Sequence, residues 1–283
     1  ANVAWRAMSC LTTGGGIGID YSLLRPAGRP LKRTGGKASG PIPLMAAINE
    51  IGRNVMQGGS RRSAIYASLQ HQHEDIPLFL EAKDWHSQKI GTSGLTAWDI
   101  KQQDFNFPAA LDMTNISVNY DETAGSLVQN PVFLQNCLQA MKTGEPGFSF
   151  NFGAKRNETL RNACTEVTSE DDSDVCNLGS VNLGNIETLD EFRSVVNLAA
   201  KFLVCGTVRA DLPYEKVRQV REKNRRLGLG LMGIHEWLLK RKQRYEVTPE
   251  LKKWLEVYEH ESERAAKEHC DRFYLSHPVA FRA

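Results

Sequence analysis

The segment from residue 162 to residue 176 contains side chains that can do chemistry. Asn162, Cys164 and Glu166 alternate along the chain, and Cys176 follows after a strongly acidic stretch. On an extended backbone alternate side chains leave the same face, so we expect these three to point together. A carboxylate can accept a proton, an amide can orient a hydroxyl group and a thiol can react, which suits a hydroxylated substrate. A coincidental grouping explains the same spacing equally well.

Glycine-rich segments near the N-terminus are accompanied by cations. The first, GGGIG at 14–18, neither fits GxGxxG before a helix nor leads into a Walker sequence, which excludes the common dinucleotide and P-loop motifs. Segments 34–40 and 57–63 bring glycine amides near side chains that can meet phosphate groups, namely Arg25, Lys32, Arg33, Arg61 and Arg62. For any one of these residues taken alone, we favour a solvated basic loop.

The histidines do not form a convincing metal site. His71 and His73 could hold a metal from one strand face, but no third ligand is near, so we favour a solvated strand end and predict no metal. His235 lies on a helix after a glycine-containing turn, where a packed or capped histidine is commoner than a catalytic base.

Bulk composition and cysteine usage indicate a cytoplasmic protein. The chain has 283 residues and a net charge of +2, which gives no electrostatic case for binding nucleic acid or a membrane. No apolar run approaches the roughly 20 residues that span a bilayer, and the first residues do not resemble a signal peptide. Six cysteines without CxxC or zinc-finger spacing indicate reduced thiols. We expect Cys137 and Cys205 to be buried in helices and Cys270 to be incidental.

Hydrophobic periodicity predicts alternating strands and helices. We expect strands at 63–69, 115–120 and 147–152, and helices at 44–57, 76–85, 131–143, 192–208 and 248–276. Residues 225–242 read as a glycine-containing turn followed by a helix. Such alternation favours an α/β fold in which side chains from strand ends meet at one site.

Taken in order, several motifs resemble one family. They are GGGIGIDYSLLRPAGRPLKRTGGKASGP, QGGSRRSA, NISV, GEPGFSF, NACTE, CNLGSVNL and NRRLGLGLMG. The chain is similar to the large catalytic subunit of ribonucleotide reductases, and most similar to the adenosylcobalamin-dependent class II branch. The resemblance implies part of a ten-stranded α/β barrel with a central loop carrying the reactive cysteine. It also implies a single catalytic barrel domain over 1–283, incomplete at both ends, with effector loops in 1–64 and the barrel core in 65–283.

The resemblance assigns a role to each residue of the opening motif. Cys164 matches the cysteine that becomes a thiyl radical and abstracts the ribose 3′-hydrogen. Glu166 matches the carboxylate that takes the 3′-hydroxyl proton, and Asn162 the amide that binds the substrate hydroxyls. Cys176 matches one of two cysteines that deliver reducing equivalents and become a disulfide. Because a thiyl radical must be kept from water, we expect Cys164 to lie inside the barrel.

The basic loops match the effector-specificity loops of the family. Arg25 and Lys32 align with cations that hold the phosphates of a deoxynucleoside triphosphate effector. Arg61 lies in the loop that reports effector identity to the substrate, which also contains Gly58, Gly59, Ser60 and Arg62. The implied cofactor is adenosylcobalamin. The implied partners are a ribonucleotide substrate, the effector, a thioredoxin-like reductant, the missing N- and C-terminal parts of the same enzyme, and a second copy in a homodimer.

Some features depart from the family pattern. The family's other redox cysteine lies further upstream than Gly14 allows, and Cys10 resembles a packing position. NACTE replaces the commoner NPCGE, and the insertion EDDSD before Cys176 is expected to bulge into solvent. We therefore expect an interior piece of a reductase that does not turn over alone. The rival interpretations are a segment of a class I large subunit, served by a separate metal-containing protein, and a non-catalytic nucleotide-binding or regulatory fragment.

Overall fold

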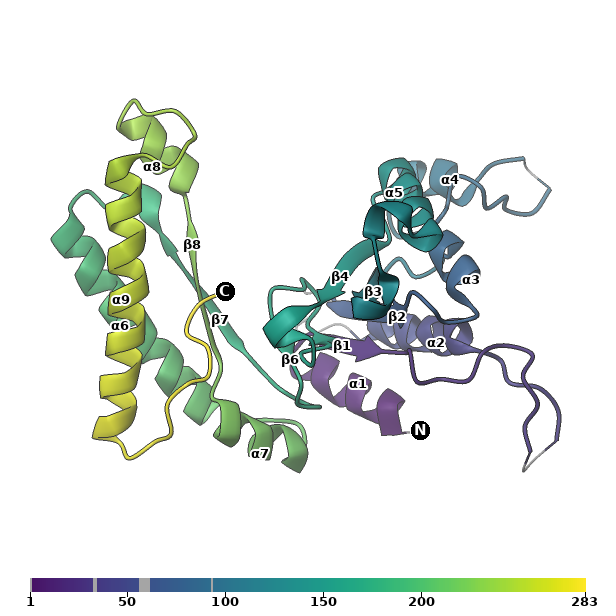
Figure 1. Cartoon of the computed structure of the whole chain (residues 1–283), viewed down its shortest axis with the longest axis horizontal. Helices are drawn as coiled ribbons and strands as arrows, with labels where there is room; N and C mark the ends of the chain where they lie inside the picture. Colours follow the sequence, from purple (N-terminus) through teal and green to yellow (C-terminus); the bar gives the residue numbers. More distant parts are fainter. Residues whose placement is uncertain (1, 33–34, 56–61, 93) are drawn as a thin grey trace. The chain divides into compact units, whose positions relative to one another are not determined.

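The computed structural model describes residues 2–32, 35–55, 62–92 and 94–283, which are drawn in colour in Figure 1. The chain divides into two compact units, Ala1–Glu170 and Asp171–Ala283. Each is described by itself. One catalytic barrel domain over 1–283, divided near residue 64, stays a prediction.

The first unit is built around a parallel sheet. Its strands follow the order β1–β2–β3–β4, with bounds Ile17–Asp20, Ile65–Gln70, Thr114–Asp121 and Gly147–Asn151. Helix α1 (Asn2–Thr12) precedes the sheet, and helices form the crossovers between successive strands (Figure 1): α2 (Pro41–Asn54), α3 (Ile76–Glu81), α4 (Ala97–Gln103) and α5 (Pro131–Thr143). Parallel strands joined by helices confirm the predicted α/β class.

The two faces of this sheet differ in chemistry. One face is apolar and packs against residues of α2 and α3; its buried members include Ala67, Leu69, Ile116, Val118 and Tyr120. The strand register places the alternate residues of β1 to β4 on the other face, where they are polar: Asp20, Tyr66, Ser68, Gln70, Ser117, Asn119, Ser149 and Asn151. We call this set the polar face.

The strand expected at 115–120 is confirmed, and its alternating polar and apolar residues, typical of a half-buried strand, occur here in a strand that is largely buried on both faces. Ser117 and Asn119 are buried together with their apolar neighbours. Strand β3 is paired on both sides, with β2 and β4. An interior strand of a parallel sheet is commonly covered on both faces, so alternation here separates two buried environments instead of core and solvent.

The second unit is a βαβ arrangement with added helices. Strand β7 (Asn177–Asn182) pairs in parallel with β8 (Leu227–Met232), and α6 (Leu189–Arg209) and α7 (Glu215–Asn224) connect them. Helix α8 (Ile234–Lys240) follows β8, and α9 (Pro249–Arg272) runs along α6 (Figure 1). The core contains the aromatic side chains Phe192, Trp237 and Trp254.

Residues 227–232 form a strand, so the predicted turn is wrong there. Leu227 and Leu229 are buried, while a Cβ atom on Gly228 would lie 2.3 Å from Cδ2 of Leu178. Glycine thus leaves room for a side chain of β7 and marks a close approach between strands. The same residue type also marks turns, which explains the error.

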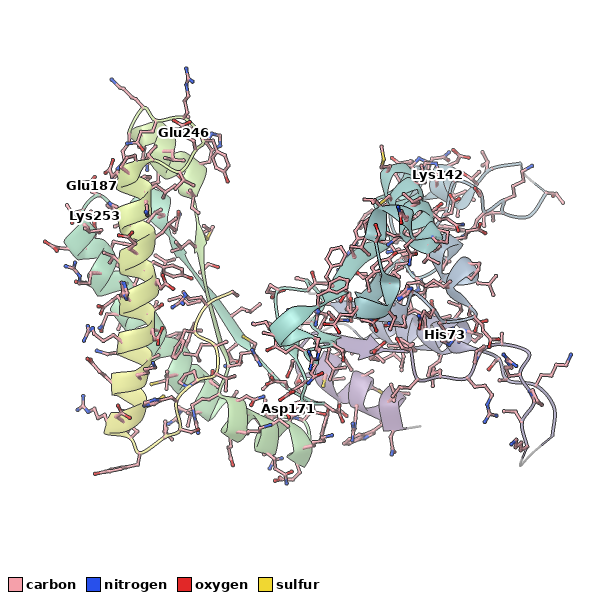
Figure 2. All side chains as sticks on the ribbon, in the orientation of Figure 1. His73, Lys142, Asp171, Glu187, Glu246 and Lys253 are labelled. Carbon is pink, nitrogen blue, oxygen red and sulfur yellow. The ribbon has the colours of Figure 1, made fainter. Side chains whose placement is uncertain are left out.

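The two histidines of QHQH are buried, so the solvated interpretation is wrong. Nε2 of His71 lies 3.2 Å from Oγ1 of Thr123, and Nε2 of His73 lies 2.9 Å from the Leu24 carbonyl oxygen. His73 is labelled in Figure 2. Both side chains have protein partners within the first unit, which assigns them to packing.

The expected burial is wrong for Cys205 and only partly correct for Cys137. Cys205 is exposed and Cys137 is partly buried, whereas Cys270 is fully buried in the core of the second unit. Apolar spacing around Cys205 misled the prediction because α6 also presents apolar side chains outward: Leu198 is 70% exposed and Phe202 is 74% exposed.

Candidate functional site

The Asn162–Glu166 motif lies on a turn between two short strands. Strands β5 (Leu160–Arg161) and β6 (Thr168–Ser169) pair antiparallel on either side of it. The Thr165 amide donates to the Asn162 carbonyl oxygen at 3.2 Å, and Thr165 has φ of +70°. The extended backbone predicted from the alternation is therefore wrong.

The turn nevertheless brings the amide and the carboxylate together. Nδ2 of Asn162 donates to Oε1 of Glu166 at 2.7 Å, and Oδ1 of Asn162 accepts from the Val167 amide at 3.1 Å. Both atoms of the Asn162 amide are thus engaged, which fixes its orientation beside the carboxylate. Cys164 lies between them in sequence, within the turn.

Cys164 itself is exposed, so the expected shelter inside a barrel is not seen. The sheet contacts the residue directly before Cys164: Nδ2 of Asn115 on β3 donates to the Ala163 carbonyl oxygen at 2.9 Å. Ala163 is buried. The sheet therefore holds the loop through Ala163 and leaves the next side chain uncovered.

Arg161 anchors the loop to the polar face. Its Nη2 donates to Oδ1 of Asn151 at 2.5 Å and to the Phe150 carbonyl oxygen at 3.3 Å, both on β4. Burial lowers the pKa of Arg161, and the nearby Tyr66, Glu158 and Asp20 oppose this. On β1, a Cβ atom at Gly18 would lie 1.7 Å from the Arg161 carbonyl oxygen, so glycine allows the loop backbone to lie directly against the strand.

Sequence reasoning missed the polar face as part of the site. Oδ1 of Asp20 accepts hydrogen bonds from Oγ of Ser22 at 2.5 Å, Oγ of Ser68 at 3.3 Å and Nδ2 of Asn119 at 3.3 Å. Within the described part of the chain, the buried Oδ1 of Asn119 has no hydrogen-bond partner. A buried acceptor of this kind can serve a polar ligand. The signal was present as polar residues at alternate positions of β2 and β3.

Cys176 lies in the second unit, directly before β7. It is partly buried, and its Sγ lies 3.8 Å from the Asn177 carbonyl oxygen. The acidic stretch before it was expected to bulge into solvent, and this holds only in part: Glu170 and Asp172 are exposed, whereas the Asp174 side chain is 4% exposed. Its carboxylates form ion pairs with cations on or next to α7: Asp171 with Lys223, Asp172 with Lys216, and Asp174 with Arg226.

Of the predicted effector residues, Arg25 and Lys32 lie in a segment whose described residues are held by hydrogen bonds. The Ala27 amide donates to Oδ2 of Asp75 at 2.9 Å, and Gly28 and Ala38 are joined by a backbone hydrogen bond of 2.9 Å. Arg25 and Lys32 are exposed on this loop. Nη1 of Arg25 donates to the Pro30 carbonyl oxygen at 3.2 Å. Both cations are therefore accessible to an anionic ligand.

Most of the predicted substrate loop lies outside the described residues: Gly58, Gly59, Ser60 and Arg61. Arg62 is described, and its guanidinium carbon lies 4.1 Å from the centre of the Phe105 ring, a cation–π contact. In the part of the chain that the structure describes, no group of three or more His, Cys, Asp or Glu side chains could hold a metal ion. No helix in that part is both long and apolar enough for a membrane span.

Comparison with known proteins identifies the relatives of this chain. A family described as "Ribonucleotide reductase, barrel domain" matches residues 2–121 and 130–267. A vitamin B12-dependent ribonucleoside-diphosphate reductase of Thermoplasma acidophilum is 28% identical over 81% of the chain and 31% of its own length. One of Mycobacterium tuberculosis is 29% identical over 80% of the chain and 34% of its length. A putative adenosylcobalamin-dependent ribonucleoside-triphosphate reductase of Mycobacterium phage D29 is 28% identical over 93% of the chain and 43% of its length. The chain thus spans between 31% and 43% of the length of these relatives.

Proposed function

The chain belongs to the ribonucleotide reductase barrel-domain family, and from that premise we propose that it carries the thiol site at which a ribonucleotide is reduced. The observation that carries the proposal is the 2.7 Å hydrogen bond that holds Asn162 and Glu166 together on the turn containing Cys164. The names of the similar proteins favour the cobalamin-dependent class over class I.

The proposed mechanism uses each residue of the turn. A thiyl radical on Cys164 takes the 3′-hydrogen atom of the ribose, and Glu166 accepts the 3′-hydroxyl proton. The Asn162 amide, oriented by its bond to Glu166, binds the substrate hydroxyls. Loss of the proton makes departure of the 2′-hydroxyl as water easier. Cys176 and a second thiol then supply two electrons and two protons and become a disulfide, so that C2′ gains hydrogen and water leaves. The hydrogen atom taken by Cys164 returns to C3′, which regenerates the thiyl radical.

The accessible sulfur of Cys164 fits a cofactor that must reach it. Adenosylcobalamin, when bound, supplies the radical chemistry that oxidises this thiol. Because the four-stranded sheet leaves Cys164 uncovered, the shelter that a radical needs must come from other parts of the complete enzyme.

We assign the basic loops to regulation. Arg25 and Lys32 would hold the phosphates of a deoxynucleoside triphosphate effector, since both are exposed on a loop fixed by backbone hydrogen bonds. The loop with Arg61 and Arg62 would carry the effector's identity to the substrate. We also propose that the chain acts together with the remaining parts of the enzyme, a thioredoxin-like reductant and a second copy in a homodimer. The proposed location is the cytoplasm.

Replacement of Cys164 tests the proposal in the complete reductase polypeptide. With adenosylcobalamin, effector and dithiothreitol, we expect Cys164→Ser to reduce deoxynucleotide formation below detection while leaving substrate binding within about threefold. The matched control is Cys205→Ser, another exposed thiol, which should stay within about twofold of the parent. Chromatography of the nucleotides measures both. Sustained turnover by Cys164→Ser would refute the assignment and favour a regulatory fragment.

Two further measurements separate the rivals. Formation of cob(II)alamin on mixing the complete enzyme with cofactor, substrate and effector would exclude the class I interpretation. The chain alone, given the same cofactor and dithiothreitol, is expected to produce no more than traces of deoxynucleotide. Multiple turnover would contradict the proposal that the chain is an incomplete piece of the reductase that cannot act alone.

A further inference from the structure

The acidic segment before Cys176 contains one carboxylate that is almost buried. We propose that the Asp174–Arg226 ion pair is a clamp that positions Cys176, so that Asp174 is a positioning residue for the reducing thiol. The role of Cys176 as a reducing thiol rests on the proposed function. The clamp itself rests on contacts within the second unit.

Asp174 is held by both of its oxygens. Oδ2 accepts from Nε of Arg226 at 3.1 Å and from Nδ2 of Asn224 at 2.9 Å, and Oδ1 accepts from the Val175 amide at 2.8 Å. The side chains of Asp174 and Arg226 are 4% and 13% exposed. The carboxylate therefore ties the backbone immediately before Cys176 to the end of α7 and the residue that leads into β8.

The clamp coincides with the first pair of the β7–β8 ladder. Arg226 directly precedes Leu227, which pairs with Asn177, the residue after Cys176. A Cβ atom at Gly228 would lie 3.0 Å from Sγ of Cys176. The thiol thus packs against bare backbone of β8, and its position depends on where the clamp fixes the start of β7.

The other carboxylates of the segment contribute differently. Asp171, labelled in Figure 2, accepts from Lys223 and Asn224, and these hydrogen bonds lower its pKa. Asp172 pairs with Lys216, but both side chains are about half exposed, at 56% and 44%. Exposed ion pairs contribute little to stability and do not fix their side chains in one place. A buried carboxylate shared by an arginine and an amide has one well-defined position. Asp174 is therefore the member that can fix the thiol.

A fixed position matters for thiol–disulfide exchange. The attacking thiolate, the sulfur it attacks and the leaving sulfur must meet in a defined geometry through a mixed disulfide. A thiol that serves first a partner cysteine and then an external reductant gains rate when its approach is restricted to the productive direction. Asp174 and Arg226 supply this restriction without taking part in the exchange themselves.

Cysteine-resolved alkylation of the chain tests the clamp without turnover. The chain is treated with iodoacetamide, and the modification rate of each cysteine is followed by mass spectrometry. We expect Asp174→Asn to raise the rate at Cys176 at least fivefold, because the thiol leaves its packing against β8. The matched control, Asp172→Asn, removes an exposed pair of the same segment and should change the rate less than twofold.

Cys270 serves as an internal reference because it is fully buried in the same unit. Asp174→Asn leaves Arg226 unpaired and could loosen the whole unit, so the double variant Asp174→Leu/Arg226→Met removes both charges together. The proposal expects Cys176 to become faster in the double variant while Cys270 stays protected.

Two results would overturn the clamp. One is an unchanged rate at Cys176 in both variants; the other is a parallel rise at Cys176 and Cys270, which would make the pair merely structural. The proposed function fails separately: a Cys176→Ser variant of the complete enzyme that reduces ribonucleotides through many turnovers would remove the reducing role and leave the alkylation result standing.

Discussion

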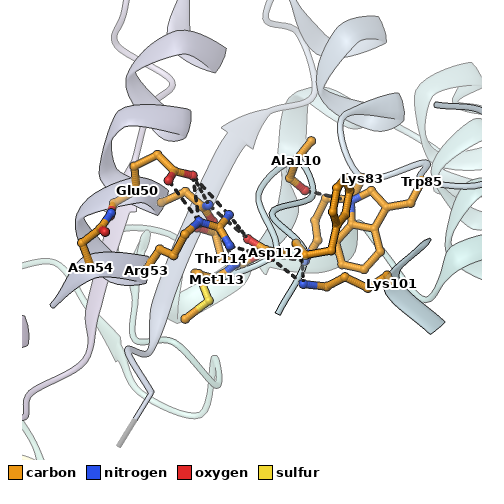
Figure 3. A network of polar contacts seen from close by, with 12 residues as sticks. Glu50, Arg53, Asn54, Lys83, Trp85, Lys101, Ala110, Asp112, Met113 and Thr114 are labelled. Carbon is orange, nitrogen blue, oxygen red and sulfur yellow. Dashed lines mark hydrogen bonds and ion pairs between the residues drawn. The ribbon is translucent and has the colours of Figure 1, made fainter. Parts of the chain in front are cut away.

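Asp112 is the centre of an ion-pair network in the first unit, shown in Figure 3, and replacing it provides a quantitative test of the fold. Its side chain is 2% exposed and lies 2.6 Å from Nη2 of Arg53 and 2.7 Å from Nζ of Lys101. Nδ2 of Asn49 donates to it at 3.3 Å. The network joins the last turn of α2 to α4 and to the segment that leads into β3. The perturbation is Asp112→Asn, which keeps the shape and removes the charge.

The pKa of Asp112 sets the magnitude. Burial by itself would raise the pKa, but hydrogen bonds from Arg53, Lys101 and Asn49 outweigh it and lower the pKa from 3.8 to about 2. A depressed carboxyl pKa stabilises the fold above the unfolded pKa, and this stabilisation is lost as the pH falls from 3.8 through about 2. At about 1.4 kcal/mol per pH unit, the full contribution is about 2 kcal/mol at pH 7 and about 1 kcal/mol at pH 3.

Replacing Asp112 should cost no more than this contribution of about 2 kcal/mol at pH 7, because Arg53 and Lys101 keep other partners. Arg53 also pairs with Glu50 at 3.0 Å, and Nζ of Lys101 donates to the Phe107 carbonyl oxygen at 2.7 Å. Without such partners, breaking a buried ion pair typically costs about 3–5 kcal/mol. We therefore expect Asp112→Asn to lower the free energy of unfolding of the first unit by about 2 kcal/mol at pH 7.

Urea denaturation at pH 7 and pH 3 measures the effect, with hydrogen exchange of β3 amides assigning the transition to the first unit. The matched control is Glu50→Gln, which removes the exposed partner of the same arginine; Glu50 is 55% exposed, so its loss should cost under about 0.5 kcal/mol at either pH. Equal destabilisation by the two variants, or an Asp112→Asn effect that does not shrink at pH 3, would refute the reasoning.

Two further substitutions test the loop that carries Cys164. Gly18→Ala should displace that loop, since its Cβ atom would lie 1.7 Å from the Arg161 carbonyl oxygen, and should make residues 160–169 at least tenfold more sensitive to protease. Gly16→Ala, whose Cβ atom would have nearest contacts of 3.2 Å or more, is the milder control. Equal protease sensitivity of the two variants would contradict the close packing of the loop against β1. Thr165→Gly should stabilise the first unit by about 1 kcal/mol in thermal unfolding, because a β-branched residue is strained at φ of +70°. A lower melting temperature would argue against the turn.

Strong local signals predicted most elements of the fold. The helix expected at 131–143 ends at Gly144 in the left-handed conformation, and the helix expected from 248 begins at Pro249 with Thr248 as its N-cap. Hydrophobic spacing and caps act within a few residues, so a sequence reports them well. The β8 strand was missed because Gly228 is required there by the side chain of Leu178, which lies on another strand, β7.

The site was predicted by composition but not by conformation, for the same reason. Alternation suggested that Asn162, Cys164 and Glu166 share a strand face, yet residues four apart on a strand are separated by about 13 Å. An amide and a carboxylate at that separation cannot form a hydrogen bond. The 2.7 Å contact therefore requires the turn, and the turn requires positive φ at Thr165, where the commoner family motif has glycine.

Which way the turn faces depends on contacts that no local pattern contains. Asn115 reaches the Ala163 carbonyl oxygen from β3, and the bare Gly18 on β1 lets the loop backbone lie against the sheet. These contacts come from strands that lie far from residues 160–166 in the sequence. The buried polar face of the sheet favours a site for a polar ligand, because a purely structural second face would be more stable if it were apolar.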